Sequence, residues 1–203
     1  MTIGRGLEWG ERVERPDQLR VVRDDRDLAQ ALTDGSAQAT RVVGGDLLQT
    51  IGGATPPGDR TVLRAPIDLI EVRLDDLPVR HAAAHVLLRL AIGRGGPLRG
   101  PVVMVMNAEF MGAWDVAPRG HPNDGRLEVL SCERSLGVRQ RLAVRKRLAT
   151  GTHLPHPEIT ARSVTSASWS FDRPVVVVSD GRRVGRARDV EISVLPDAAV
   201  LYV

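Results

Sequence analysis

The chain has 203 residues, 42% of them hydrophobic, and a net charge of +3 at pH 7, which suits one large soluble domain or two small ones. It has no run of about 18 apolar residues, so we expect no transmembrane helix, and its first residues lack the apolar core of a secretory signal. The only cysteine is Cys132, which excludes a disulfide within the chain and fits a reducing cytoplasm.

The positive charge comes almost entirely from arginine, because Lys146 is the only lysine. Arginine stays charged far above neutral pH, so a small excess raises the pI to about 9.9. Aromatic residues make up only 3% of the chain, so platforms for base stacking are scarce. We therefore do not expect a nucleic acid partner, and the composition gives no indication of the oligomeric state.

The N-terminal part alternates short strands and short helices. Residues 19–23 predict a strand, and either Asp24 or Asp25 is expected to cap the helix that follows. Residues 40–43 predict a second strand, and residues 47–51 a second, shorter helix. This order is typical of an α/β segment, although a short one.

The clearest linker covers residues 54–60, which are rich in proline and glycine. After it, short strands with glycine and proline between them predict a sandwich or barrel-like β-domain, interrupted by one helix over residues 136–149. Val138, Leu142 and Ala149, with Leu148, are expected to form the apolar stripe of that helix. The expected strands are residues 62–63, 67–74, 79–90, 102–106, 127–130, 158–165, 168–171, 174–178, 184–186, 190–194 and 200–203.

The expected fold class is therefore α+β. A reduced N-terminal α/β segment over residues 1–58 should pack on a larger antiparallel β-sandwich-like domain over residues 59–203 that carries one helix. About 50 residues rarely supply an independent core, so the first segment should not fold alone.

Several short motifs occur in a fixed order in the second half of the chain. They are Asn107–Pro118, Asn123–Val129, Asp172–Val175, Asp180-Gly181-Arg182 and Val194–Ala198. This ordered set resembles the C-terminal β-domain of the diacylglycerol-kinase-like lipid kinases, over about residues 67–203. The resemblance implies a bacterial, cytoplasmic protein that uses ATP and Mg²⁺ to phosphorylate a lipid hydroxyl such as that of diacylglycerol.

The resemblance also implies a structural magnesium site in the 121–126 loop. The family holds the ion with one aspartate side chain and two backbone carbonyls, which correspond here to Asp124 and to the carbonyls of His121 and Arg126. A hard cation prefers oxygen ligands of this kind. From the residues alone, Asn123-Asp124-Gly125 is a turn between two strands, with or without an ion.

A second motif of the family, a Gly-Gly-Asp-Gly-Thr loop that receives ATP phosphates, is only half present. The chain keeps Gly44, Gly45 and Asp46 as cofactor-binding candidates but has Leu47 and Leu48 where the family has glycine and threonine. A Cβ at such a position hinders the close approach of the backbone to a phosphate. The favoured interpretation is a helix-entry turn with Asp46 as N-cap.

The third motif departs most clearly, because Arg182 stands where the family has its proposed catalytic base, a glutamate. A guanidinium cannot accept a proton near neutral pH, which leaves Asp180 as the catalytic candidate. Arg182 and Arg183 could bind a phosphate or an acidic headgroup instead. The simpler interpretation of Ser179-Asp180-Gly181 is a hairpin turn.

The predicted helix over residues 136–149 carries the densest basic patch of the chain. A basic helix of this kind can lie on an anionic membrane, which predicts a peripheral association; the alternative is a solvated helix face. The patch consists of Arg139, Arg141, Arg145, Lys146 and Arg147.

Two functions fit these features. The first is a degenerate relative of the lipid kinases that binds lipid or phosphate ligands, and the second is an active ATP-dependent lipid kinase. Arg182 and the altered loop after Asp46 favour the first.

Overall fold

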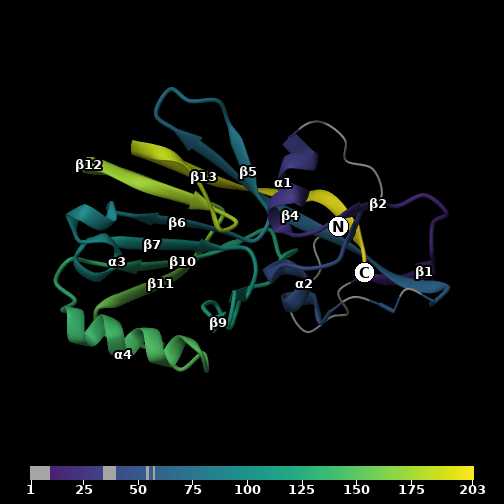
Figure 1. Ribbon diagram of the computed structural model, residues 1–203, viewed down its shortest axis with the longest axis horizontal. Helices are drawn as coiled ribbons and strands as arrows, with labels where there is room; N and C mark the ends of the chain where they lie inside the picture. The colour runs from purple at the N-terminus through teal and green to yellow at the C-terminus, as the bar shows by residue number, and fades with distance from the viewer. Residues whose placement is uncertain (1–9, 34–39, 54, 57) are drawn as a thin grey trace.

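The computed structural model describes residues 10–33, 40–53, 55–56 and 58–203, and these form an antiparallel β-sandwich-like body with a small α/β segment at one end (Figure 1). The fold is α+β, as the sequence predicts, with many more residues in strands than in helices. None of the helices in these ranges is both long and apolar enough to cross a lipid bilayer.

The N-terminal segment consists of short elements in β-α-β-α order after a first edge strand. These are β1 (Glu11–Glu14), β2 (Arg20–Val22), α1 (Asp25–Thr33), β3 (Thr40–Val42) and α2 (Asp46–Ile51). The two strands β2 and β3 pair in parallel, and β3 also pairs in parallel with the far end of the chain, at Leu201 opposite Thr40. The segment is thus joined to the β-domain by backbone hydrogen bonds.

The β-domain begins with a long strand and ends with a longer one. Its strands are β4 (Thr61–Leu74), β5 (Arg80–Ala82), β6 (His85–Arg89), β7 (Val102–Met106), β8 (Phe110–Met111), β9 (Trp114–Asp115), β10 (Leu127–Cys132), β11 (Ile159–Val164), β12 (Ser166–Ser179) and β13 (Arg182–Tyr202). Its helices are a 3-10 turn η1 (Ile92–Arg94), α3 (Gly96–Arg99) and α4 (Val138–Leu148).

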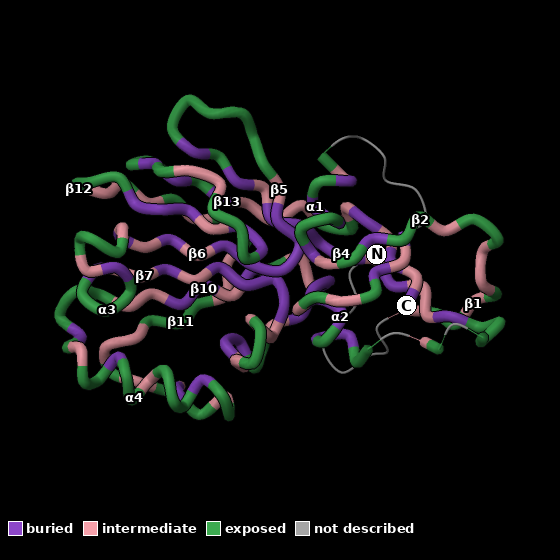
Figure 2. The backbone as a smooth tube through the Cα atoms, viewed as in Figure 1, coloured by how far each residue is buried: buried purple, intermediate pink, exposed green. Residues whose placement is uncertain are grey.

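Within the described residues, eleven strands form one sheet whose main path is β1-β4-β13-β12-β6-β7-β10-β11. The strands β8 and β9 form a separate small hairpin. All pairs along the main path are antiparallel. Buried residues, purple in Figure 2, recur along these strands.

Two apolar clusters account for most of the interior. The first fills the sandwich and includes Val72, Val86 and Val177, all fully or almost fully buried. The second joins the two parts of the chain, because Leu28 and Leu47 of the N-terminal helices pack in the same cluster as strand residues of β4 and β13. The N-terminal segment is therefore packed on the β-domain, as its small size predicts.

Several expected strands are parts of longer ones. The expected strands 62–63 and 67–74 are both within β4, and the three expected after residue 183 all belong to β13. The pairing of β13 with β4 shifts register between Leu195 and Ala199, where Pro196 and the positive φ of Asp197 lie. Proline is tolerated at a bulge, so it bends this strand without ending it.

The expected strand over residues 79–90 is instead interrupted between β5 and β6. The backbone N–H groups of Ala83 and Ala84, at the interruption, point to the Asp180 carboxylate. The expected apolar stripe of α4 is also partly wrong. Leu148 is buried, but Leu142 is 44% exposed, and the buried residue in its neighbourhood is Arg141.

Candidate functional site

The Gly44-Gly45-Asp46 motif lies at the junction between β3 and α2, where a strand leads into a helix. Gly45, with φ of 109°, precedes the helix, and Asp46 is its first residue rather than its N-cap. The carboxylate of Asp25 accepts hydrogen bonds from the backbone N–H groups of Asp46, at 2.6 Å, and Leu47, at 3.3 Å. A Cβ on Gly45 would lie only 2.6 Å from either oxygen of that carboxylate.

The two aspartates that could cap α1 therefore have different partners. Asp24 accepts the N–H of Asp27 at 3.0 Å and so caps α1, whereas Asp25 turns to α2. Asp25 is 5% exposed. The pKa of Asp25 is raised to about 7, chiefly by burial and next by the charge of Asp180, while the hydrogen bond from the N–H of Asp46 acts against the shift.

The side chain of Asp46 connects the α2 junction to two parts of the β-domain. One oxygen accepts the N–H of Gly112 at 2.7 Å, and the other lies 2.9 Å from Nε2 of His85 at the start of β6. Burial lowers the pKa of His85, but the hydrogen bond to Asp46 and the charge of Asp180 raise it more, so the net shift is upward. His85 in its charged form thus has carboxylates around it.

Asp180 lies in the turn between β12 and β13 with a φ of 44° and is 8% exposed. Its carboxylate accepts the backbone N–H groups of Ala83, Ala84 and His85 at 2.9–3.0 Å. Burial raises the pKa of Asp180, and these hydrogen bonds and the charge of His85 act against it. The carboxylate holds the turn against the interruption between β5 and β6, which is a structural role.

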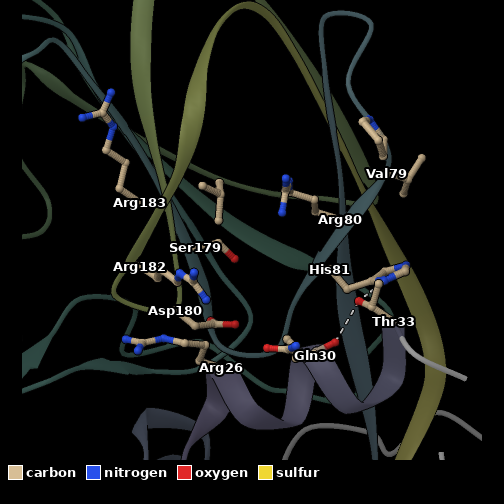
Figure 3. A pocket seen from close by; sticks show the side chains of 13 residues that line it. Arg26, Gln30, Thr33, Val79, Arg80, His81, Ser179, Asp180, Arg182 and Arg183 are labelled. Atoms are coloured by element: carbon tan, nitrogen blue, oxygen red, sulfur yellow. Dashed lines mark hydrogen bonds between the residues drawn. The ribbon is translucent and has the colours of Figure 1, made fainter. Parts of the chain in front are cut away.

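A pocket of about 480 Å³ lies beside Asp180, between α1, β5 and the β12–β13 turn (Figure 3). Four arginines are among its lining residues, namely Arg26 of α1, Arg80 of β5, and Arg182 and Arg183 of β13. On the wall formed by α1 and β5, the hydroxyl of Thr33 is 3.1 Å from Nδ1 of His81. The pocket thus joins the N-terminal segment to the β-domain.

The predicted magnesium loop lies elsewhere and is held by another buried carboxylate. Asp68, which is fully buried, accepts the N–H of Gly125 at 2.7 Å and that of Asp197 at 2.9 Å. Burial raises the pKa of Asp68. Asp124 accepts the N–H of Arg126 at 2.9 Å, which is the hydrogen bond of a tight turn.

No group of three or more His, Cys, Asp or Glu side chains is placed to bind a metal in the part of the chain that the structure describes. A magnesium site at Asp124 would depend on one carboxylate and the carbonyls of His121 and Arg126, and it stays a prediction. Among the described residues, no hydrogen bond or ion pair links Asp124 to Asp46 or Asp180.

The basic patch on α4 has four exposed members rather than five. Arg139, Arg145, Lys146 and Arg147 are exposed. Arg141 is 6% exposed, and its guanidinium donates to the carbonyls of Leu136, Pro97 and Glu133, so it joins α4 to α3 and to the loop before α4.

The structure brings Asp46 and Asp180 into one buried polar group, through Asp25 and His85. Sequence analysis did not select Asp25 or His85 for this site. The one usable signal was the pair of adjacent aspartates before α1, only one of which can cap that helix. Arg26 and Arg80 had no sequence signal, because isolated arginines are common in this chain.

Known proteins resemble this chain in sequence and in fold. The family model of the YegS C-terminal NAD kinase beta sandwich-like domain matches residues 79–203, more than half of the chain. The chain belongs to this family. This membership confirms the predicted resemblance to the diacylglycerol-kinase-like lipid kinases over the β-domain. A comparison with curated proteins found no match.

Solved structures show that the likeness of this YegS-type chain extends to its N-terminal segment. A proposed diacylglycerol kinase from Bacillus anthracis str. Sterne is 14% identical, with a TM-score of 0.63 over 90% of this chain and 77% of that one. A second structure of a proposed diacylglycerol kinase from the same organism is 12% identical, with a TM-score of 0.65 over 90% and 76%. At these identities the comparison establishes the fold alone.

Proposed function

We propose that this protein is a degenerate member of the lipid-kinase-like family that no longer transfers phosphate from ATP and that binds a lipid or phosphate ligand. The alternative is an active ATP-dependent lipid kinase. The observation that carries the proposal is the position of the Asp25 carboxylate on the backbone N–H groups of Asp46 and Leu47.

In the family, the resemblance assigns this strand-to-helix junction to the phosphates of ATP. A phosphate would need the same N–H groups that Asp25 already occupies, and its negative charge would be repelled by that carboxylate. Leu47, which replaces the glycine of the motif, is fully buried and does not give the backbone room to move. The residues at this junction therefore do not fit ATP phosphates.

The second observation that supports the proposal is that the chain lacks the family's catalytic glutamate. Arg182 stands where the family has glutamate, and it cannot accept a proton from a lipid hydroxyl. Asp180, the remaining candidate, has both carboxylate oxygens engaged by three backbone N–H groups. Removing a proton from a substrate would require Asp180 to give up part of this anchoring.

Two features support a remaining role in ligand binding. The first is the arginine-lined pocket beside Asp180. The second is the exposed basic face of α4, where Arg145 also lies over the ring of Trp114 at 5.4 Å. We include in the proposal that this face contacts an anionic lipid surface, through Arg139, Arg145, Lys146 and Arg147.

The test is a pair of measurements on the purified wild-type protein. Calorimetric titration with Mg-ATP should give no dissociation constant in the low micromolar range. Incubation with labelled ATP and diacylglycerol-type lipids should give no labelled lipid above background. Clear turnover would establish the active-kinase alternative, with Asp180 as the base, and would end the proposal.

A further inference from the structure

We infer that the pocket between α1, β5 and the β12–β13 turn is a binding site for a phosphomonoester, which Arg80 and Arg182 hold from opposite sides while Arg26 adds positive charge beside the turn. This inference rests on the ligand-binding half of the proposed function and names the ligand class and the residues. It does not depend on what happens to ATP.

The arginines come from elements that are far apart in the sequence. Arg26 is in the first turn of α1, Arg80 begins β5, and Arg182 begins β13. Figure 3 shows Arg80 and Arg182 on opposite sides of the opening. The guanidinium of Arg26 lies below Arg182, beside the β12–β13 turn, and Arg183 is directed away from the centre. The α1 and turn walls meet closely, since a Cβ on Gly181 would be 3.8 Å from Nη2 of Arg26.

These guanidinium groups are available for a ligand. Arg26, Arg80 and Arg182 are all exposed, and in the part of the chain that the structure describes none has a hydrogen-bond or ion-pair partner. The nearest lining carboxylate, Asp180, accepts three backbone N–H groups and so is already neutralised in part. Three positive charges around one partly compensated carboxylate leave an excess of positive charge in the pocket.

A phosphomonoester suits this arrangement better than a singly charged anion. Its charge is close to −2 at neutral pH, and its three terminal oxygens accept hydrogen bonds from several directions. A guanidinium offers paired N–H donors that match such oxygens. The hydroxyl of Ser179, which is directed into the pocket, has no hydrogen-bond partner among the described residues and could donate to a further oxygen.

The rest of the pocket suggests a small organic body attached to the phosphate. A volume of about 480 Å³ exceeds what a phosphate ion fills and is in the usual range for small-molecule sites. Pro78, Val79 and Val184 line the same pocket, and Leu77, which is 45% exposed, precedes Pro78 in the loop between β4 and β5. The volume has room for the glycerol part of a glycerol phosphate or of a phosphatidic acid, and the apolar groups match the acyl chains of the latter.

The test is a calorimetric titration in the absence of ATP, with glycerol 3-phosphate as the phosphomonoester and glycerophosphoglycerol as the matched phosphodiester. The monoester should bind with a dissociation constant below about 1 mM, and the diester at least about tenfold more weakly. Arg182→Gln and Arg80→Gln should each weaken the monoester about tenfold or more, since each removes charged hydrogen bonds. Co-sedimentation with vesicles containing phosphatidic acid or phosphatidylglycerol shows whether the phosphate is part of a lipid.

Arg162→Gln is the matched control, because Arg162 is exposed on β11 at the other edge of the sheet and the change removes the same charge. Thermal unfolding of each variant verifies that it folds. If one of the two pocket variants does not fold, the other is enough for the test. Stronger binding to vesicles with phosphatidic acid than to those with phosphatidylglycerol would identify a lipid headgroup as the ligand. Equal binding to the two kinds of vesicle, with glycerol 3-phosphate still bound, would identify a soluble phosphomonoester. Absence of monoester binding to the wild type, or equal affinity in Arg182→Gln and Arg162→Gln, would overturn the inference. Neither result depends on phosphate transfer, so the two proposals fail separately.

Discussion

Replacing Asp25 by asparagine should change how the stability of the protein depends on pH. The pKa of Asp25 is raised from 3.8 to about 7, chiefly by burial. A carboxyl whose folded pKa is raised binds its proton more tightly in the folded state, so its contribution to stability is complete below about pH 4 and is lost as the pH rises through 7. Asparagine keeps an oxygen acceptor for the α2 amides but does not titrate.

The size of the effect follows from the shift. One pKa unit corresponds to about 1.36 kcal/mol, so a shift of about three units corresponds to about 4 kcal/mol in total. Between pH 5 and 8 the wild type should lose about 3 kcal/mol of unfolding free energy through Asp25. The raised pKa of His85 acts with the same sign, because its contribution is present below pH 6.5 and is lost as the pH rises.

Urea unfolding at several values between pH 5 and 8, followed by circular dichroism, measures this dependence. From pH 5 to pH 8, the unfolding free energy of Asp25→Asn should rise by about 3 kcal/mol relative to that of the wild type. The altered hydrogen bonds should add a difference of about 1–2 kcal/mol that does not depend on pH. Asp27→Asn, an exposed change in the same helix turn, is the control and should run parallel to the wild type. Parallel curves for Asp25→Asn would refute the assignment of the shift to Asp25.

Other parts of the structure give further predictions. Arg182→Glu should produce no lipid phosphorylation from labelled ATP, because the α2 amides stay occupied; turnover in this variant alone would mean that the nucleotide site is intact. Charge reversal at Arg139 and Lys146 together should reduce co-sedimentation with anionic vesicles, each residue contributing about 1 kcal/mol at most, and unchanged binding would exclude this helix face. A fragment of residues 1–58 should show no cooperative thermal unfolding; a sharp transition would make it an independent domain. Asp68→Ala should cost about 2–4 kcal/mol in urea unfolding, because two backbone N–H groups lose their acceptor; a loss under 1 kcal/mol would assign that acceptor role to water.

Local sequence signals predicted the elements of the N-terminal segment but not how they connect. The β-α-β-α order and the turn at Gly44-Gly45 follow from propensity and glycine placement, and the structure has both. Which of Asp24 and Asp25 caps α1 depends on where α2 lies in space, and a local pattern carries no such information. The hydrogen bonds from the first N–H groups of α2 to the Asp25 carboxylate therefore could not be predicted from the sequence.

The sequence-based predictions were also wrong about where long strands end and about which charged residue of α4 is buried. The bulge at Pro196 and Asp197 looks in sequence like the end of a strand, but partners on both sides keep β13 continuous. Arg141 has the same kind of sequence neighbours as the exposed arginines of α4, and only the carbonyls of α3 and of the loop before α4 explain why it is buried. Such positions are decided by contacts between distant segments, which a single sequence does not show.

The course of β13 also sets the order in which the protein can fold. Its far end supplies the parallel partner of β3 at Leu201, and the backbone groups of Val203 bond to Leu63 and to the hydroxyl of Thr55, which is 148 positions away. The cluster around the two N-terminal helices also contains Ala199, Leu201 and Val203, so it is completed only after β13 has been synthesised. Contacts between such distant segments slow folding and expose the chain to aggregation. We expect this protein to need chaperone protection early in its synthesis more than an isolated β-domain of the same family would.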